Sequence, residues 1–310
     1  MPVRIDKNLP AGKFLERENI FVMDKDRAEV QDIRPLKIAV LNLMPNKIAT
    51  ETQLIRLIGN TPLQIDLCLL TTKTYTPKNA PEEHLRSFYR TFDDIRRTGE
   101  KFDGLIITGA PVEKMDFLAV AYWPELEEIL RWAVKNVYSS LFICWAAQAA
   151  MYHYYGINKR MLDKKLFGVF PHTVLDRNNP LVRGFDDTFF APHSRYTEVE
   201  EALIAREPDL DILAKSDRAG AHLVASKSLR RVFVFGHGEY DADTLRGEFE
   251  RDRDKGLGTA LPENYFPGGD PARRPPLLWR AHESLLVCNW LNYCVYQATP
   301  FDLNAIDEIG

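Results

Sequence analysis

The sequence predicts an α/β protein with a doubly wound, mostly parallel sheet. Short apolar runs typical of buried strands alternate with segments of helical periodicity from residue 36 to about residue 151, which is the pattern of strands joined by crossover helices. The 310 residues also suit one large α/β domain, and the chain carries no internal repeat. We therefore expect an N-terminal arm over residues 1–34 and a single α/β domain over residues 35–310.

The first half of the chain has the clearest elements. The run from Leu36 to Leu43 is expected to be a buried strand that ends before Pro45. Thr52 to Gly59 has helical spacing, and its final glycine suits a helix C-terminus. The same alternation then predicts strands over Leu63–Leu70 and Asp103–Gly109, and helices over 81–98 and Pro124–Val134.

The second half is less regular. The expected strand Arg231–Phe235 runs straight into Gly236–Asp241, and Asp241 is expected to cap a helix that continues to about Asp254. A C-terminal helical region is expected over Leu277–Tyr296. Further candidate strands are Phe167–Phe170, Ile212–Lys215 and His222–Ala225.

Composition excludes several classes of protein. Hydrophobic residues make up 45% of the chain and charged residues 27%, and no apolar run approaches the length of a membrane span. Residues 1–6 lack the apolar core of a signal peptide. The four cysteines show no CxxC spacing, and the net charge of −4 comes with no dominant basic face. We expect a cytoplasmic protein with reduced thiols, no metal, and neither nucleic acid nor membrane as a partner.

Cys144 stands where an apolar strand turns into an Ala-rich helix. Ser139–Ile143 favours a strand and Trp145–Met151 favours a helix, so the cysteine is expected at the carboxyl edge of the sheet. The start of a helix also favours a thiolate. Taken alone, this cysteine fits a buried core residue better than a nucleophile, because free cysteine is among the most often buried residue types.

His237 and Glu239 favour the interpretation of Cys144 as a nucleophile. His237 follows an apolar strand within a Gly-His-Gly turn, and Glu239 lies two residues on, where a carboxylate can accept a hydrogen bond from one imidazole nitrogen and leave the other free as a base. Separately, they fit a turn histidine and a solvated acid equally well. Together with Cys144 they provide the nucleophile, base and orienting acid of covalent acyl transfer.

Two other histidine motifs carry less information. His193, in Ala191–Tyr196, is expected in a polar loop and is interpreted as structural. His282–Glu283, in the terminal helix, lacks a second ligand at metal-binding spacing. No nucleotide-binding glycine loop is present in the sequence.

Beyond these residues, the chain resembles the homoserine O-acyltransferase family of methionine biosynthesis, which is built on the class I glutamine amidotransferase fold. Phe142 and Ala146 replace the glycines of a Gly-x-Cys-x-Gly elbow, and this departure favours the acyltransferase branch over glutamine hydrolysis. The stretches that carry the resemblance run in family order: Leu41–Lys47, Thr108–Glu113, Cys144–Ala146, Arg183–Asp187, Ala191–Tyr196, Gly236–Asp241, Asn264–Pro267 and Asn289–Tyr293.

The resemblance implies a double displacement. Cys144 would take the acyl group from an acyl-CoA, His237 would then act as base on the γ-hydroxyl of L-homoserine, and Glu239 would orient His237. The backbone N–H groups of Trp145 and Gly109 are the oxyanion-hole candidates. The resemblance further implies substrate contacts from Lys165, Ser194 and Arg251, no cofactor beyond acetyl-CoA as co-substrate, and a homodimer by analogy.

Glu113 selects the acyl group in this interpretation. In the family, glutamate at this position accompanies acetyl-CoA and glycine accompanies succinyl-CoA, because a carboxylate there repels the distal carboxylate of a succinyl group. The sequence therefore predicts acetyl transfer. The alternatives are a succinyltransferase, a glutamine amidohydrolase subunit and a non-catalytic metabolite-binding protein on the same fold.

Overall fold

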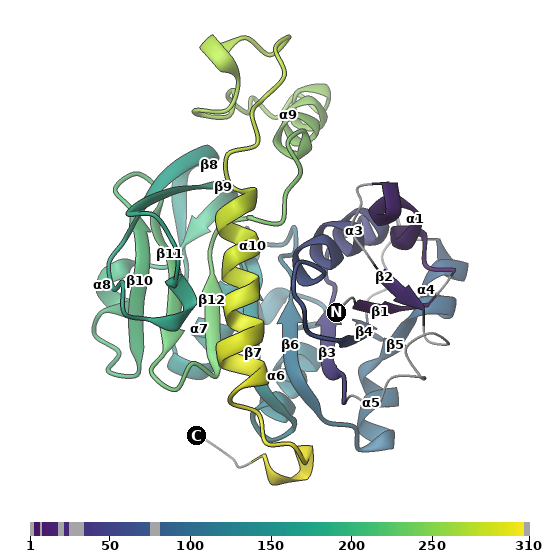
Figure 1. Ribbon diagram of the computed structural model, residues 1–310. Coiled ribbons are helices and arrows are strands. Elements are labelled where there is room, and N and C mark those ends of the chain that lie inside the picture. Colours follow the sequence, from purple (N-terminus) through teal and green to yellow (C-terminus); the bar gives the residue numbers. More distant parts are fainter. Residues whose placement is uncertain (1–2, 7, 18–21, 25–33, 75–80, 307–310) are drawn as a thin grey trace.

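The computed structural model describes residues 3–6, 8–17, 22–24, 34–74 and 81–306 (Figure 1). One twelve-stranded sheet runs through the molecule in the order β2-β1-β4-β3-β6-β7-β12-β11-β10-β8-β9, with β5 paired to β4. Its parallel part contains β1 (Val3–Ile5), β2 (Val22–Asp24), β3 (Leu36–Leu41), β4 (Ile65–Thr71), β5 (Tyr89–Thr91), β6 (Phe102–Ile107), β7 (Val137–Ile143) and β12 (Arg231–Val234).

Helices cover both faces of the parallel part, so the predicted doubly wound α/β class is confirmed. On one face, α1 (Pro10–Arg17), α3 (Lys47–Ile58) and α10 (Arg280–Asn289) pack into a shared apolar core. On the other, α5 (Phe92–Thr98), α6 (Trp123–Asn136) and α7 (Trp145–Tyr155) do the same. Strands β3, β6 and β7 are mainly apolar and almost entirely buried, as a sandwiched parallel sheet requires.

The rest of the sheet is antiparallel. It is made of β8 (Arg160–Val174), β9 (Thr188–Glu198), β10 (Leu210–Ser216) and β11 (Gly220–Ser226), and it joins the parallel part through β12. Helix α8 (Glu201–Ile204) connects β9 to β10, and α9 (Thr244–Asp254) stands beyond the ends of β8 and β9 (Figure 1). The loop after α9 docks on β8 at Gly168, where a Cβ atom would lie 2.3 Å from the Glu263 carbonyl oxygen.

Several local predictions were wrong. The expected helix over 81–98 is α4 (Glu82–Phe88), strand β5 and α5, because a capping box between Thr91 and Asp94 starts a new helix. The segment Ala191–Tyr196 lies in strand β9 rather than in a polar loop. Helix α9 begins after Asp243, and the Asp241 carboxylate instead pairs with Arg56 and Arg280.

The C-terminal helical region begins at Arg280 rather than at Leu277, and it reaches Tyr296 as predicted. Its first part is α10, which ends at Asn289, and its second part is a π-helical segment, Trp290–Tyr296. At the other end of the chain, β1 and β2 extend the sheet beside β4, so the described part of residues 1–34 packs on that edge. The boundary at residue 34 stays a prediction. None of the helices in the described residues combines the length and hydropathy needed to cross a bilayer.

Candidate active site

Cys144 occupies a strained turn between β7 and α7. Its backbone has φ 52° and ψ −111°, a conformation that non-glycine residues adopt rarely and that is concentrated at functional sites. Its N–H donates to the Val234 carbonyl of the adjacent strand β12 at 2.7 Å, and its carbonyl accepts from Gln148 N–H at 3.2 Å. These bonds hold the turn, so the buried thiol is fixed at the carboxyl edge of β7.

His237 reaches the same edge because β12 is the neighbour of β7. Val234 pairs in register with Ile143, so the loop after β12 begins where Cys144 turns away from the sheet. His237 Nδ1 lies 2.7 Å from Glu239 Oε1, and the Cys144 side chain is near enough to raise the pKa of the imidazole. Cys144, His237 and Glu239, which the sequence predicts to act together, therefore lie next to one another in the buried interior.

The electrostatics favour a charged imidazole. Burial lowers the pKa of His237, but the Cys144 thiol and the Glu239 carboxylate outweigh that effect and hold the pKa well above its usual value. An imidazolium beside the thiol stabilises a thiolate, which is the nucleophilic form of cysteine. The arrangement therefore suits a cysteine nucleophile that is activated by His237.

The backbone of Gly109 and Trp145 lies beside Cys144 and His237. A Cβ atom on Gly109 would lie 3.3 Å from His237 Cε1 and 3.5 Å from Cys144 Cβ, so the turn after β6 passes directly beside both residues. Trp145 is the first residue of α7, where N–H groups have no acceptor within the helix. Both positions suit an oxyanion hole, and that role stays a prediction.

Lys165, Ser194 and Arg251 come together around two acids that sequence reasoning missed. Lys165 Nζ lies 2.9 Å from Asp252 Oδ2 and 3.6 Å from Glu248 Oε2, and Ser194 Oγ donates to Glu248. Arg251 pairs with Asp252 at 2.8 Å while its side chain stays half exposed. Glu248 and Asp252 are four residues apart on α9 and so share one helix face, a spacing that the sequence displays.

Tyr240 connects this polar group to His237. Its ring stacks on the imidazole with centroids 4.3 Å apart, and its hydroxyl donates to Glu248 Oε1 at 2.8 Å. Burial, with Glu248 and Glu239 nearby, holds the pKa of Tyr240 well above its usual value, so the phenol remains a donor. The polar group and the Cys144 set thus form one continuous site.

Glu113 lies in the turn that follows β6, three residues after Ala110. Its side chain is half-buried, and Lys159 Nζ donates to its backbone carbonyl and, at 2.6 Å, to the carbonyl of Met115. Lys159 therefore fixes the shape of this turn. Gly109, which borders Cys144, lies in the loop that leads to Glu113, and a place for Glu113 at the rim of the site stays a prediction.

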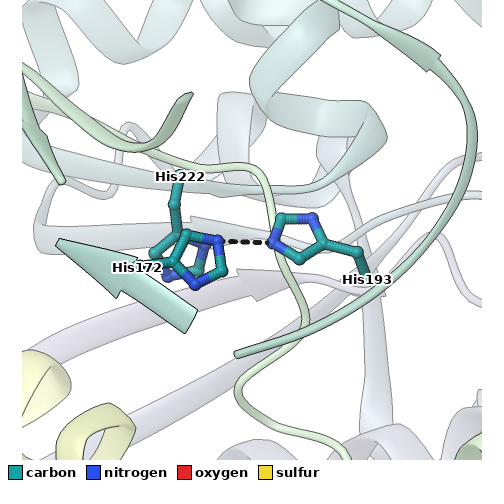
Figure 2. A group of neighbouring side chains, drawn as sticks. All are labelled: His172, His193 and His222. Atoms are coloured by element: carbon teal, nitrogen blue, oxygen red, sulfur yellow. Dashed lines mark hydrogen bonds between the residues drawn. The ribbon is translucent and has the colours of Figure 1, made fainter. Parts of the chain in front are cut away.

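Three buried histidines lie behind the site, and their ring nitrogens could by type and spacing ligate a metal (Figure 2). His172, His193 and His222 each offer one nitrogen within 4.8 Å of the others, and the pKa of each is lowered by burial, that of His172 to about 3. They come from β8, β9 and β11, three strands distant in sequence, which is why sequence reasoning did not group them.

The surroundings of this cluster disfavour a dication. Arg195 Nε donates to His193 Nδ1 at 3.4 Å, which keeps the proton on Nε2, the atom that faces His172 Nε2 at 3.0 Å (Figure 2). A metal there would have to displace that proton beside a buried guanidinium, with no carboxylate in the cluster. We interpret the cluster as a neutral buried support. His172 and His193 are hydrogen-bonded to each other, His222 packs against Gly236, and the backbone N–H of His237 donates to the Pro192 carbonyl.

The sequence relatives and the family model that match this chain name homoserine, and they differ in the acyl group that they name. A family model described as homoserine O-succinyltransferase matches residues 2–301. A homoserine O-acetyltransferase of Acetivibrio thermocellus is 57% identical over 306 residues, covering 99% of this chain and 100% of that protein. Proteins of the same name from Bacillus cereus and Desulfitobacterium hafniense are 56% and 52% identical, over 98% and 100% of this chain and 100% and 99% of theirs.

Solved structures support the fold alone. A glutamine amidotransferase from Thermotoga maritima matches with a TM-score of 0.51 at 13% identity, covering 85% of this chain and all of that one. One from Methylobacillus flagellatus matches with a TM-score of 0.53, also at 13% identity, over 84% of this chain and 95% of that one. The expected class I glutamine amidotransferase-like architecture is therefore confirmed.

Proposed function

The chain belongs to the homoserine O-succinyltransferase family, and from this premise we propose that it transfers an acetyl group from acetyl-CoA to the γ-hydroxyl of L-homoserine. The product is O-acetyl-L-homoserine for methionine biosynthesis. The full-length relatives named homoserine O-acetyltransferase support the choice of acyl group. The observation that carries the chemistry is the buried contact chain from Cys144 through His237 to Glu239.

In the first half-reaction the Cys144 thiolate attacks the thioester carbonyl of acetyl-CoA. Backbone N–H groups of Trp145 and Gly109 receive the negative charge on oxygen, and His237 gives its proton to the departing CoA thiolate. Cys144 then holds the acetyl group as a new thioester. The high pKa of His237 supports this step because the imidazole starts out charged.

In the second half-reaction His237, now neutral, takes the proton of the homoserine γ-hydroxyl. The hydroxyl oxygen attacks the Cys144 thioester, O-acetylhomoserine leaves, and the thiolate–imidazolium pair is restored. Lys165 and the half-exposed Arg251 suit the α-carboxylate of homoserine, and the Glu248 carboxylate, held by Ser194 and Tyr240, suits its ammonium group. Glu239 keeps His237 oriented throughout.

We further propose that this chemistry needs no metal or cofactor, and that the protein works in the cytoplasm, where the thiol nucleophile stays reduced. A homodimer is proposed by analogy with the family. Light scattering at working concentration measures the oligomeric state.

The direct test compares three activities of the purified protein. We expect homoserine-dependent release of CoA from acetyl-CoA, slower release from succinyl-CoA, and no release of ammonia from glutamine. Faster turnover of succinyl-CoA would favour the succinyltransferase that the family description names. Glutamine hydrolysis would favour an amidotransferase subunit instead.

A further inference from the structure

Glu283 is a buried carboxyl group that the proposed reaction does not use. It lies in the first turn of α10, and its side chain rests on the backbone of Gly238, between His237 and Glu239. A Cβ atom at position 238 would lie 2.0 Å from Glu283 Cδ and 2.0 Å from Oε2. Glycine is therefore required at position 238 to make room for this carboxyl group.

The charges that act on Glu283 come from the candidate catalytic loop. They are Glu239 and His237, and they oppose each other. The charged neighbours on α10 itself are engaged elsewhere, since Arg280 pairs with Asp241 and His282 with Asp186. Among the described residues, no basic side chain forms an ion pair with Glu283, so an ionised carboxylate there would be buried without a partner.

The position of Glu239 gives a second reason for the Glu283 carboxyl group to be neutral. Its Oε1 bonds His237, whereas its Oε2 is buried and has no hydrogen-bond partner among the described residues. A second anion on the far side of Gly238 would repel this carboxylate and draw His237 away from Cys144. Consistent with this, burial and the nearby Glu239 raise the pKa of Glu283 to about 8, against a smaller opposing effect of His237.

We propose that Glu283 is a positioning residue that acts as a neutral carboxylic acid: it packs on Gly238 and fixes the loop, and it leaves Glu239 the single ionised carboxylate behind His237. The role extends the proposed acyl transfer and rests on it for its effect on rate. Its protonation state does not depend on that function. Ionisation of Glu283 then adds a negative charge that loosens the Glu239–His237 pair.

Thermal unfolding tests the protonation state without reference to activity. A carboxyl group that stays protonated in the fold stabilises it most below the pKa of the unfolded chain, and that stability is lost as pH rises through the folded pKa. Relative to the isosteric, non-titrating Glu283→Gln, the wild type should therefore lose Tm steadily between pH 5 and 8 and level off above. Glu83→Gln, an exposed change on α4, should show a constant difference.

Enzyme rate gives the second readout. The ratio of kcat for Glu283→Gln to that of the wild type should be near one at pH 6.5 and rise about threefold or more by pH 9, with KM unchanged, because only the wild type acquires the second charge. A Tm difference that is constant with pH, or a wild type that gains Tm relative to Glu283→Gln as pH rises from 5 to 8, would overturn the proposal. If Glu283→Gln does not fold, Glu283→Met gives the same comparison with a neutral side chain of similar length.

Discussion

At the residue scale, opposing effects on its pKa set the charge of His237. Burial alone would keep the imidazole neutral, yet the thiol on one side and the carboxylate on the other hold its pKa well above the usual value. The same two neighbours fix which nitrogen faces Cys144, because Nδ1 is taken by Glu239. Charge and orientation of the proposed base therefore come from one set of contacts.

Glu113 carries the prediction on acyl specificity. Glu113→Gly should raise kcat/KM for succinyl-CoA by about tenfold or more relative to acetyl-CoA, because it removes both the negative charge and the bulk that oppose a succinyl carboxylate. Glu113→Gln keeps the size and removes the charge, so it separates the two effects. Steady-state kinetics with both CoA esters measure the change. Unaltered preference in both variants would show that Glu113 is not the selector.

At the element scale, the candidate strands Phe167–Phe170, Ile212–Lys215 and His222–Ala225 lie within β8, β10 and β11, so the antiparallel part was predicted in its strand cores, whereas β9 was missed. Strands β3, β4, β6 and β7 are mainly apolar runs with a few polar residues, so the sequence locates them within a few residues. Strand β9 contains Pro192 and buried polar groups whose partners lie far away in sequence, such as His172 for His193 and the Ala219 carbonyl for Arg195. Local periodicity does not record such partners.

The candidate site divides in the same way. Cys144 and His237 end neighbouring strands of the parallel part, so their meeting followed from topology. Glu248 and Asp252 matter only because α9 folds over β8 and β9, and Glu283 only because α10 packs on Gly238. Those contacts depend on long-range packing, which one sequence does not reveal.

The packing of α10 on the candidate catalytic loop makes a second prediction. Gly238→Ala should lower the free energy of unfolding by about 1–3 kcal/mol, because the new methyl group overlaps the Glu283 carboxyl group. Gly247→Ala, in α9, meets nothing within 4 Å and should raise the stability by roughly 0.5–1 kcal/mol through helix propensity. Urea unfolding of both variants gives the comparison. Equal effects would contradict the packing described for Glu283.

At the scale of the whole molecule, the buried histidines predict sensitivity to acid. Burial lowers the pKa values of His172, His193 and His222, whereas the unfolded chain binds protons at these residues near pH 6.5. Their contribution to stability is therefore full above about pH 6.5 and is lost as pH falls toward the folded pKa values. Tm measured from pH 7.5 to 5 should fall, and less steeply in His222→Gln.

The central claim is that Cys144 carries the acetyl group, and intact-protein mass spectrometry tests it most directly. Mixing the protein with acetyl-CoA, without homoserine, should add the mass of one acetyl group, and adding homoserine should remove it. Cys144→Ala should gain nothing, and succinyl-CoA should label the wild type more slowly. Wild-type protein that never acquires the acetyl mass, while still folded by its thermal transition, would contradict the mechanism and favour a metabolite-binding role.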